Sequence, residues 1–155
     1  MLPKHILVPT DLSEGAEYAL DYACELARRL DATIHLLNVI GIPALGVPEL
    51  GVALTSTIID QLVTENQKAL DDVADARRAT TQIGQVLLRT GDARELINET
   101  ARELGADLIV MGTHGRRGIS RALLGSVAET VVRSAPCAVL TVRTTDPGHS
   151  DRHAA

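Results

Sequence analysis

Residues 108–131 constrain the fold of this chain more strongly than any other stretch. Residues 108–111 form a short, continuous apolar run, which is typical of a parallel strand covered on both faces. Gly112 ends this run, and a loop rich in glycine and arginine follows as far as Gly125. Apolar residues then recur with helical spacing. The stretch therefore predicts a strand, a loop and a helix in direct succession.

The loop in this stretch has the features of an anion site. Glycine lets a ligand approach the backbone closely, and the first turn of a helix offers free N–H groups at the positive end of its dipole. Three arginines, Arg116, Arg117 and Arg121, add positive charge. Together these features favour a chain of phosphates as the ligand.

Two common phosphate motifs do not fit the loop. Walker A needs a lysine, which the loop lacks, and the glycines are wrongly spaced for the dinucleotide fingerprint. The pattern present is Gly112-x-x-Gly115, nine residues, and then Gly125-Ser126. It resembles the ATP-binding signature of the universal stress protein family, in its nucleotide-binding branch.

A purely structural interpretation of the same residues stays open. Ser126 and Glu129 have the spacing of a capping box, which would satisfy the start of the helix without a ligand. The glycines could likewise end a strand or serve turns. We favour the phosphate site because glycines, serine, strand and helix occur together in one stretch.

Length and composition limit the class of protein. The 155 residues suffice for one domain with a sizeable core, which must be aliphatic because Tyr18 and Tyr22 are the only aromatic residues. A net charge of −5 without a basic tract argues against nucleic acid as a partner. The apolar stretches are shorter than the roughly 20 residues of a membrane span, and the start does not resemble a signal peptide. Cys24 and Cys137 lack metal-site spacing, so we expect buried thiols in a cytoplasmic protein.

Apolar runs alternate with amphipathic segments along the chain. The predicted strands are residues 4–8, 33–39, 82–89, 108–111 and 138–142, and the predicted helices lie within residues 16–30, 58–79, 93–104 and 126–133. This order predicts an α/β fold with a doubly wound, five-stranded parallel sheet and helices on both faces. The resemblance covers residues 4–142 and implies the strand order 3-2-1-4-5.

Two segments stand apart from this alternation. Residues 41–57 are expected to form a long apolar loop, either a lid or binding surface or a mobile insertion. Residues 1–143 are assigned to one nucleotide-binding domain, and residues 144–155 are expected to be a disordered tail. Among the histidines, His5 and His35 fall within strands and are expected to serve packing.

Ligands of doubly wound sheets bind at the carboxyl ends of the strands, where the strand order reverses. If the first and fourth strands are neighbours, Asp11 and the glycine loop flank one crevice. The resemblance implies that Asp11 contacts the nucleoside, although Asp11 and Ser13 are also plausible helix N-caps. It assigns Pro9, Thr10 and Val39 to the adenine pocket, with the backbone of Val39 reading the base edge.

The phosphates are expected to lie against the backbone of the glycine loop, with their terminal groups near Ser126. Met111 either packs on the purine or belongs to the core. One loop arginine, here Arg116, is expected to contribute charge, and His114 either reaches a phosphate or is merely packed. The predicted nucleotide-binding residues are Pro9, Thr10, Asp11, Val39, Met111, Gly112, Gly115, Arg116, Gly125, Ser126 and Val127.

The sequence therefore predicts an ATP-binding, cytoplasmic sensor or regulator of the stress response. The loop has no carboxylate for a metal, so any Mg²⁺ or Mn²⁺ is expected to be held mainly by the phosphates of ATP. We assign no catalytic residue and expect at most weak hydrolysis. The alternatives are a slow ATPase switch and a nucleotide-independent dimeric stress module.

The last predicted strand, Ala138 to Val142, would be a sheet edge in the order 3-2-1-4-5. It is largely apolar and carries neither a lysine nor an interior proline that would discourage pairing. Two copies meeting antiparallel across a two-fold axis would satisfy both edges, and the resemblance implies the same assembly. We expect a homodimer through this strand; the alternative is an edge covered by the tail.

Overall fold

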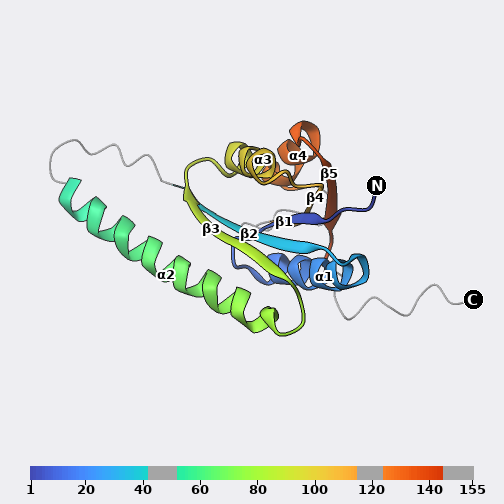
Figure 1. The fold of residues 1–155 in the computed structure, drawn as a ribbon. Coiled ribbons are helices and arrows are strands. Elements are labelled where there is room, and N and C mark those ends of the chain that lie inside the picture. Colours follow the sequence, from blue (N-terminus) through green and yellow to red (C-terminus); the bar gives the residue numbers. More distant parts are fainter. Residues whose placement is uncertain (42–51, 115–123, 145–155) are drawn as a thin grey trace, which may run out of the picture.

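The structure, a computed structural model, describes residues 1–41, 52–114 and 124–144, and for residues 52–55 it describes the backbone alone. Strands and helices alternate along the chain (Figure 1). The elements are β1 (His5–Pro9), α1 (Glu14–Leu30), β2 (Thr33–Ile40), α2 (Val52–Arg78), β3 (Ile83–Thr90), α3 (Ala93–Leu104), β4 (Leu108–Gly112), α4 (Ser126–Ser134) and β5 (Ala138–Val142). Most of the predicted tail and most of the apolar loop lie outside the described residues.

The five strands form one parallel sheet in the order β3-β2-β1-β4-β5, which confirms the predicted fold. β1 lies at the centre, with Leu7 opposite His35 of β2 and Ile109 of β4. Figure 1 shows α3 and α4 on one face of the sheet and α1 and α2 on the other. The strand order reverses between β1 and β4, because β1 continues to β2 on one side and β4 continues to β5 on the other.

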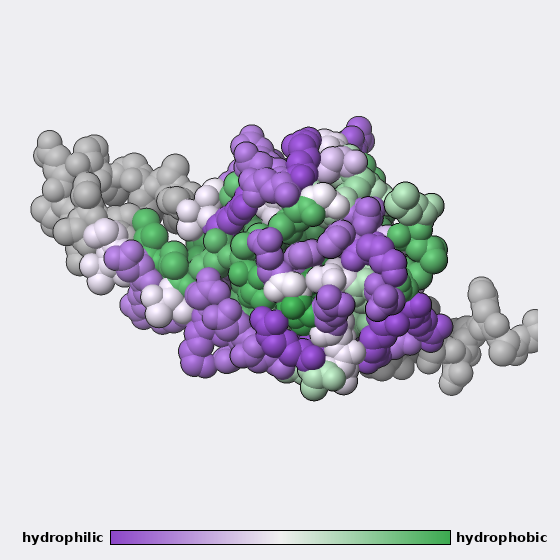
Figure 2. Space-filling view, in the orientation of Figure 1, coloured by the Kyte–Doolittle hydropathy of each residue, from purple (hydrophilic) through white to green (hydrophobic). Residues whose placement is uncertain are grey.

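The core is aliphatic and has two layers, one on each face of the sheet. Alternate strand residues enter opposite layers, as the two-residue period of a strand requires. Ile6 and Leu36 pack with α1 and α2, whereas Leu7 and Leu37 pack with α3 and α4. Figure 2 shows apolar surface along β3, between hydrophilic residues of α2 and α3, and the side chains of Val86, Leu87 and Leu88 are half-buried there.

One predicted boundary is wrong. Helix α2 begins at Val52, whereas the sequence analysis assigned residues 52–57 to the loop and began the helix at Ile58. Residues 52–57 are three apolar residues followed by three hydroxyl residues without a charged side chain, so they show no amphipathic helical pattern. They also contain no glycine or proline, so nothing in them stops a helix that propagates from its amphipathic part.

Candidate functional site

The carboxyl ends of β1 and β4 lie side by side at the centre of the sheet. Pro9 ends β1 and is followed by Thr10 and Asp11, and Gly112 ends β4. Since the strand order reverses between these two strands, the structure brings these predicted site residues to the position where doubly wound sheets bind their ligands.

The turn after β1 is fixed by hydrogen bonds from both of its sides. The backbone N–H of Thr10 donates to the Leu37 carbonyl at 2.8 Å, and Thr10 Oγ1 accepts from the N–H of Leu12 at 3.0 Å. Leu12 has a φ of 62°, in the left-handed region. Asn38 Nδ2 donates to the Thr10 carbonyl at 2.7 Å. Thr10 is buried, so it shapes the turn with its side chain as well as its backbone.

Asp11 acts on the start of α1 through Ser13. Its Oδ1 accepts from the N–H of Ser13 at 3.0 Å and from the Ser13 hydroxyl. Ser13 is the N-cap of α1, and its hydroxyl oxygen accepts from the N–H of Ala16 at 3.3 Å. Of the two predicted N-cap candidates the structure thus selects Ser13. The half-buried carboxylate of Asp11 is held at the N-terminus of α1.

The starts of α1 and α4 converge on the end of β4. The N–H of Gly125 donates to the Thr113 carbonyl at 2.8 Å, and the N–H of Thr113 donates to the Val142 carbonyl at 3.2 Å. A Cβ atom on Gly125 would lie 3.0 Å from the Thr113 carbonyl oxygen, and one on Gly112 would lie 3.3 Å from that of Gly15. These backbones pack so closely because no side chain stands between them.

The first turn of α4 has no capping side chain among the described residues. Gly125 is its N-cap and Ser126 is its first residue, so the capping box considered for Ser126 and Glu129 is not formed. Glu129 instead pairs with Arg133 at 3.0 Å. Ser126 is exposed and Val127 is half-buried. The hydroxyl of Ser126 is therefore at the surface, at the positive end of the helix dipole.

For His114 the sequence left two roles open, contact with a phosphate or simple packing. Its Nδ1 lies 2.9 Å from Thr113 Oγ1, and its Nε2 is buried without a hydrogen-bond partner. For Met111 the alternatives were contact with the purine or a place in the core. Met111 is 6% exposed and packs in the core layer under α3 and α4. The contact of Met111 with a purine therefore stays a prediction.

Gly115 and Arg116, which belong to the predicted nucleotide-binding set, lie outside the described residues. So do the other two loop arginines, Arg117 and Arg121. Val39 is half-buried near the end of β2, where it pairs with Arg89 of β3. The structure thus brings the turn after β1 and the start of α4 together, with Val39 on the neighbouring strand.

Asn38 is a site-shaping residue that the sequence analysis missed. It is 3% exposed, and besides its bond to the Thr10 carbonyl its Oδ1 is buried without a partner. The signal was present in the sequence, because Asn38 is a polar residue inside an apolar strand. Its amide holds the end of β2 against the turn that carries Asp11.

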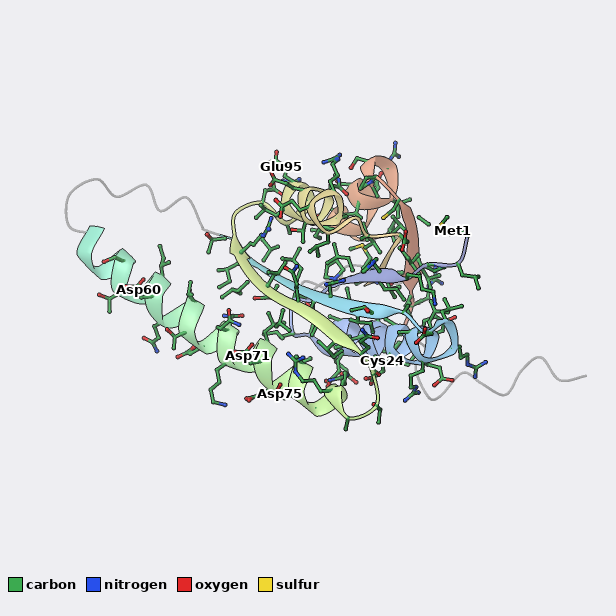
Figure 3. All side chains as sticks on the ribbon, in the orientation of Figure 1. Met1, Cys24, Asp60, Asp71, Asp75 and Glu95 are labelled. Carbon is green, nitrogen blue, oxygen red and sulfur yellow. The ribbon has the colours of Figure 1, made fainter. Side chains whose placement is uncertain are left out.

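Other polar features lie apart from this site. A groove of about 530 Å³ between α3 and α4 is lined by Asp92, Arg94, Glu95, Asn98, Glu99, Arg102, Thr130 and Ser134. Within it, the Arg94 guanidinium lowers the pKa of the Asp92 carboxyl to about 2. Figure 3 labels Glu95 on α3 and Asp60, Asp71 and Asp75 along α2, and all four residues are exposed. None of these residues belongs to the predicted set.

The described part of the chain contains no group of three or more His, Cys, Asp or Glu side chains placed to hold a metal ion. No helix within it is long and apolar enough to span a membrane. Cys24 is buried and Cys137 half-buried, and burial raises the pKa of both thiols.

The sheet order and the helices on both faces define a doubly wound α/β protein, and comparison with known proteins identifies its family. The profile of the Universal stress protein family matches residues 3–143. Universal stress protein MJ0531 of Methanocaldococcus jannaschii is 38% identical over 144 residues, which cover 92% of this chain and 83% of that protein. This chain therefore belongs to the universal stress protein family.

Solved structures agree with this assignment. Universal stress protein UspA from Lactobacillus plantarum matches with a TM-score of 0.81 and 28% identity, covering 90% of this chain and 97% of that one. A universal stress protein in complex with cAMP matches with a TM-score of 0.63 and 24% identity, covering 94% of this chain and all (100%) of the other. At this level of identity, the second match shows similarity of fold only.

The role of Asn38 leads to a prediction about stability. Replacing Asn38 with Ala leaves the buried Thr10 carbonyl without its donor, which should lower the free energy of unfolding by about 1–3 kcal/mol. The matched control is Asn66→Ala on α2, where Asn66 donates to the Leu62 carbonyl at the surface. That change should cost less than about 0.5 kcal/mol. Urea unfolding measures both, and equal losses would show that Asn38 does not hold the turn.

Proposed function

We propose that this universal stress protein binds ATP where β1 and β4 end, and acts in the cytoplasm as a nucleotide-dependent regulator of the stress response. The observation that carries the proposal is the start of α4. Its N-cap is Gly125, no side chain of the described residues caps it, and Ser126 is exposed beside it. Uncapped N–H groups and a hydroxyl can donate hydrogen bonds to a phosphate, and the positive end of the helix dipole favours its negative charge.

The phosphate end of the ligand lies against glycine backbone in this proposal. Gly112 already packs against the backbone of Gly15, so the end of β4 presents main chain rather than side chains. Gly115 completes the phosphate site by resemblance to the family signature, and Arg116 contributes positive charge. Any Mg²⁺ or Mn²⁺ is bound mainly by the phosphates.

The nucleoside end lies over the turn after β1. Asp11 is held by Ser13 and remains half-buried, so its carboxylate is positioned beside the carboxyl end of the central strand β1. A carboxylate in this place suits the hydroxyl groups of ribose. Pro9, Thr10 and Val39 would form the aliphatic and backbone surface around adenine. The related universal stress protein in complex with cAMP supports an adenosine nucleotide as the ligand class.

Regulation is favoured over catalysis as the outcome of binding. The described residues include no group of three or more His, Cys, Asp or Glu side chains placed to hold a catalytic metal, and Glu129, the carboxylate in the first turn of α4, is paired with Arg133. A slow ATPase that switches on turnover remains the second candidate, and a nucleotide-independent dimeric module the third. Multiple-turnover phosphate release and calorimetry with ATP separate the three.

We also propose that two copies assemble through β5. β5 pairs with β4 on one side, and Val139 and Leu140 are half-buried. An edge strand with apolar residues and unpaired backbone groups is normally covered or paired. An antiparallel β5 strand from a second copy would pair with the unpaired backbone N–H and C=O groups of this edge.

The ATP site is tested by replacing Gly115 with Val. A branched side chain would occupy the space of the phosphates, so the dissociation constant for ATP should rise at least about tenfold, equivalent to about 1.4 kcal/mol. Isothermal titration calorimetry measures the change, and circular dichroism checks the fold. The control is Gly41→Val, because a Cβ on Gly41 meets nothing within 4 Å. Unchanged affinity in a folded Gly115→Val protein would remove the loop from the site.

The assembly is tested by replacing Leu140 with Pro, which removes a backbone N–H from β5 and should convert a dimer into a monomer. Light scattering at micromolar concentration measures the mass. The control is Leu62→Asp on α2, which lies beside β3 at the opposite edge of the sheet (Figure 1) and should leave the mass unchanged. A monomeric wild-type protein, or a dimeric Leu140→Pro variant, would contradict the assembly.

A further inference from the structure

His35 joins three strands through its imidazole ring. The residue lies in β2 and is 7% exposed. Its Nδ1 accepts a hydrogen bond from the backbone N–H of Gln85 in β3 at 3.1 Å. Its Nε2 lies 3.3 Å from Nδ1 of His5 in β1, with the ring centroids 5.5 Å apart. His35 is thus buried as the sequence predicted, but His5 is exposed rather than packed.

These contacts fix the position of the ring protons. The N–H of Gln85 is a donor, so Nδ1 of His35 must be unprotonated. A neutral His35 therefore carries its proton on Nε2 and donates it to Nδ1 of His5. The same assignment keeps Nε2 from acting as a metal ligand while the bond from Gln85 is intact.

His35 lies opposite an irregularity in the pairing of β2 with β3. Ile34 is opposite Ile83, but Leu36 is opposite Val86, so two residues of β3 face the single residue His35. This is the count of a β-bulge. A Cβ on Gly84, one of the two bulged residues, would lie 2.8 Å from Cε1 of His35. The imidazole therefore fills the space beside the glycine and serves as the acceptor that the bulge needs.

The bulge sets the register of the sheet beyond it. After the bulge Val39 lies opposite Arg89 and Ile40 opposite Thr90, and the N–H of Gly91 donates to the Ile40 carbonyl at 3.0 Å. Without the extra residue the pairing would slip by one position, and every following side chain of β3 would change faces. The contact of His35 with Gln85 therefore stabilises one register of an edge strand.

The surroundings of His35 oppose a positive charge on its ring. Burial and then the charge of His5 lower its pKa. Asp107, directly before β4, accepts from the backbone N–H groups of Lys4 and His5 at 2.9 Å, and on β3, Arg89 pairs with Glu103 of α3 at 3.2 Å.

The remaining charged residues of the two helices on this face are engaged elsewhere. Those of α3, which are Arg94, Glu95, Glu99 and Arg102, line the groove between α3 and α4, and those of α4, Glu129 and Arg133, pair with each other. α1 and α2 pack on the opposite face, against Ile34 and Leu36. Among the described residues no carboxylate contributes to the shift of the His35 pKa, so none of them compensates a protonated ring.

We propose that the His5–His35 pair is a proton-operated lock on edge strand β3, which holds the bulge in register when both rings are neutral and releases it in mild acid. A proton on Nδ1 of His35 would face the N–H of Gln85, donor against donor. That protonation breaks the contact of His35 with β3. This inference does not depend on nucleotide binding.

The direction of the pH dependence follows from the pKa of His35. Its value in the folded chain lies below that of an unfolded histidine, which is about 6.5. The stabilising contribution is therefore fully present above about pH 6.5 and is lost as the pH falls toward the folded-state pKa. The loss should appear first as local opening at Gln85, because β3 is a sheet edge.

The wild-type protein provides the first test, by nuclear magnetic resonance. At pH 7 the ¹⁵N shifts of the His35 ring should report a proton on Nε2. Between pH 6.5 and 5.5 the exchange of the Gln85 amide, corrected for its intrinsic rate, should accelerate up to about tenfold, while the amide of Ile109 in β4 should not. A proton on Nδ1 at pH 7, or an unchanged Gln85 amide, would overturn the proposal.

The second test uses His35→Gln, whose side-chain oxygen accepts a hydrogen bond but does not titrate. The exchange of the Gln85 amide should then become independent of pH, whereas the control His149→Gln should keep the wild-type response. The same pH response in His35→Gln as in wild type would refute the role of His35. If His35→Gln does not fold, the wild-type tautomer and the Gln85 amide decide the question.

Discussion

The hydrogen bond from the N–H of Gly125 to the Thr113 carbonyl is the contact on which the candidate site depends. It folds the start of α4 back onto the end of β4, and Gly112 lets the start of α1 approach the same place. Two helix N-termini thereby meet at the central strands of a parallel sheet. Helix dipoles add there, and only one of the two helices, α1, is capped by a side chain among the described residues.

This arrangement explains why the two halves of the proposed ligand site differ. At α1 the hydroxyl of Ser13 accepts a hydrogen bond from an N–H of the first turn. The backbone N–H of Ser13 donates to Asp11, so a carboxylate lies at this helix start. At α4 the first turn begins with an exposed Ser126 and presents backbone donors. The first end suits hydroxyl groups and the second suits phosphates, and a nucleotide carries both.

Much of the fold could be predicted because its signals are local. Continuous apolar runs marked the buried strands, and Gly112 marked the end of β4. The start of α2 was missed because the apolar and polar residues of 52–57 do not alternate with a helical period. The capping box was a plausible alternative on spacing alone, but the backbone contact of Gly125 made that residue the N-cap and left Ser126 as the first residue of the helix.

Side chains that act on distant backbone were the part that sequence could not predict. Asn38 donates to Thr10, 28 positions away, and His35 accepts from Gln85, 50 positions away. Such pairs depend on strand register, and the β2–β3 register contains a bulge that no periodicity reveals. The membership of the universal stress protein family, in contrast, followed from the glycine pattern and was confirmed by the family profile and relatives.

The central claim, that ATP binds where β1 and β4 end, is tested most directly by titrating ¹⁵N-labelled protein with ATP and following the backbone amides. The account predicts saturating shifts in the turn after β1, at Leu12 and Ser13, and in the first turn of α4, at Ser126 and Val127. The amides of Asn98 and Glu99, beside the groove between α3 and α4, should stay unchanged. Shifts confined to that groove, or no shifts at millimolar ATP, would contradict the claim.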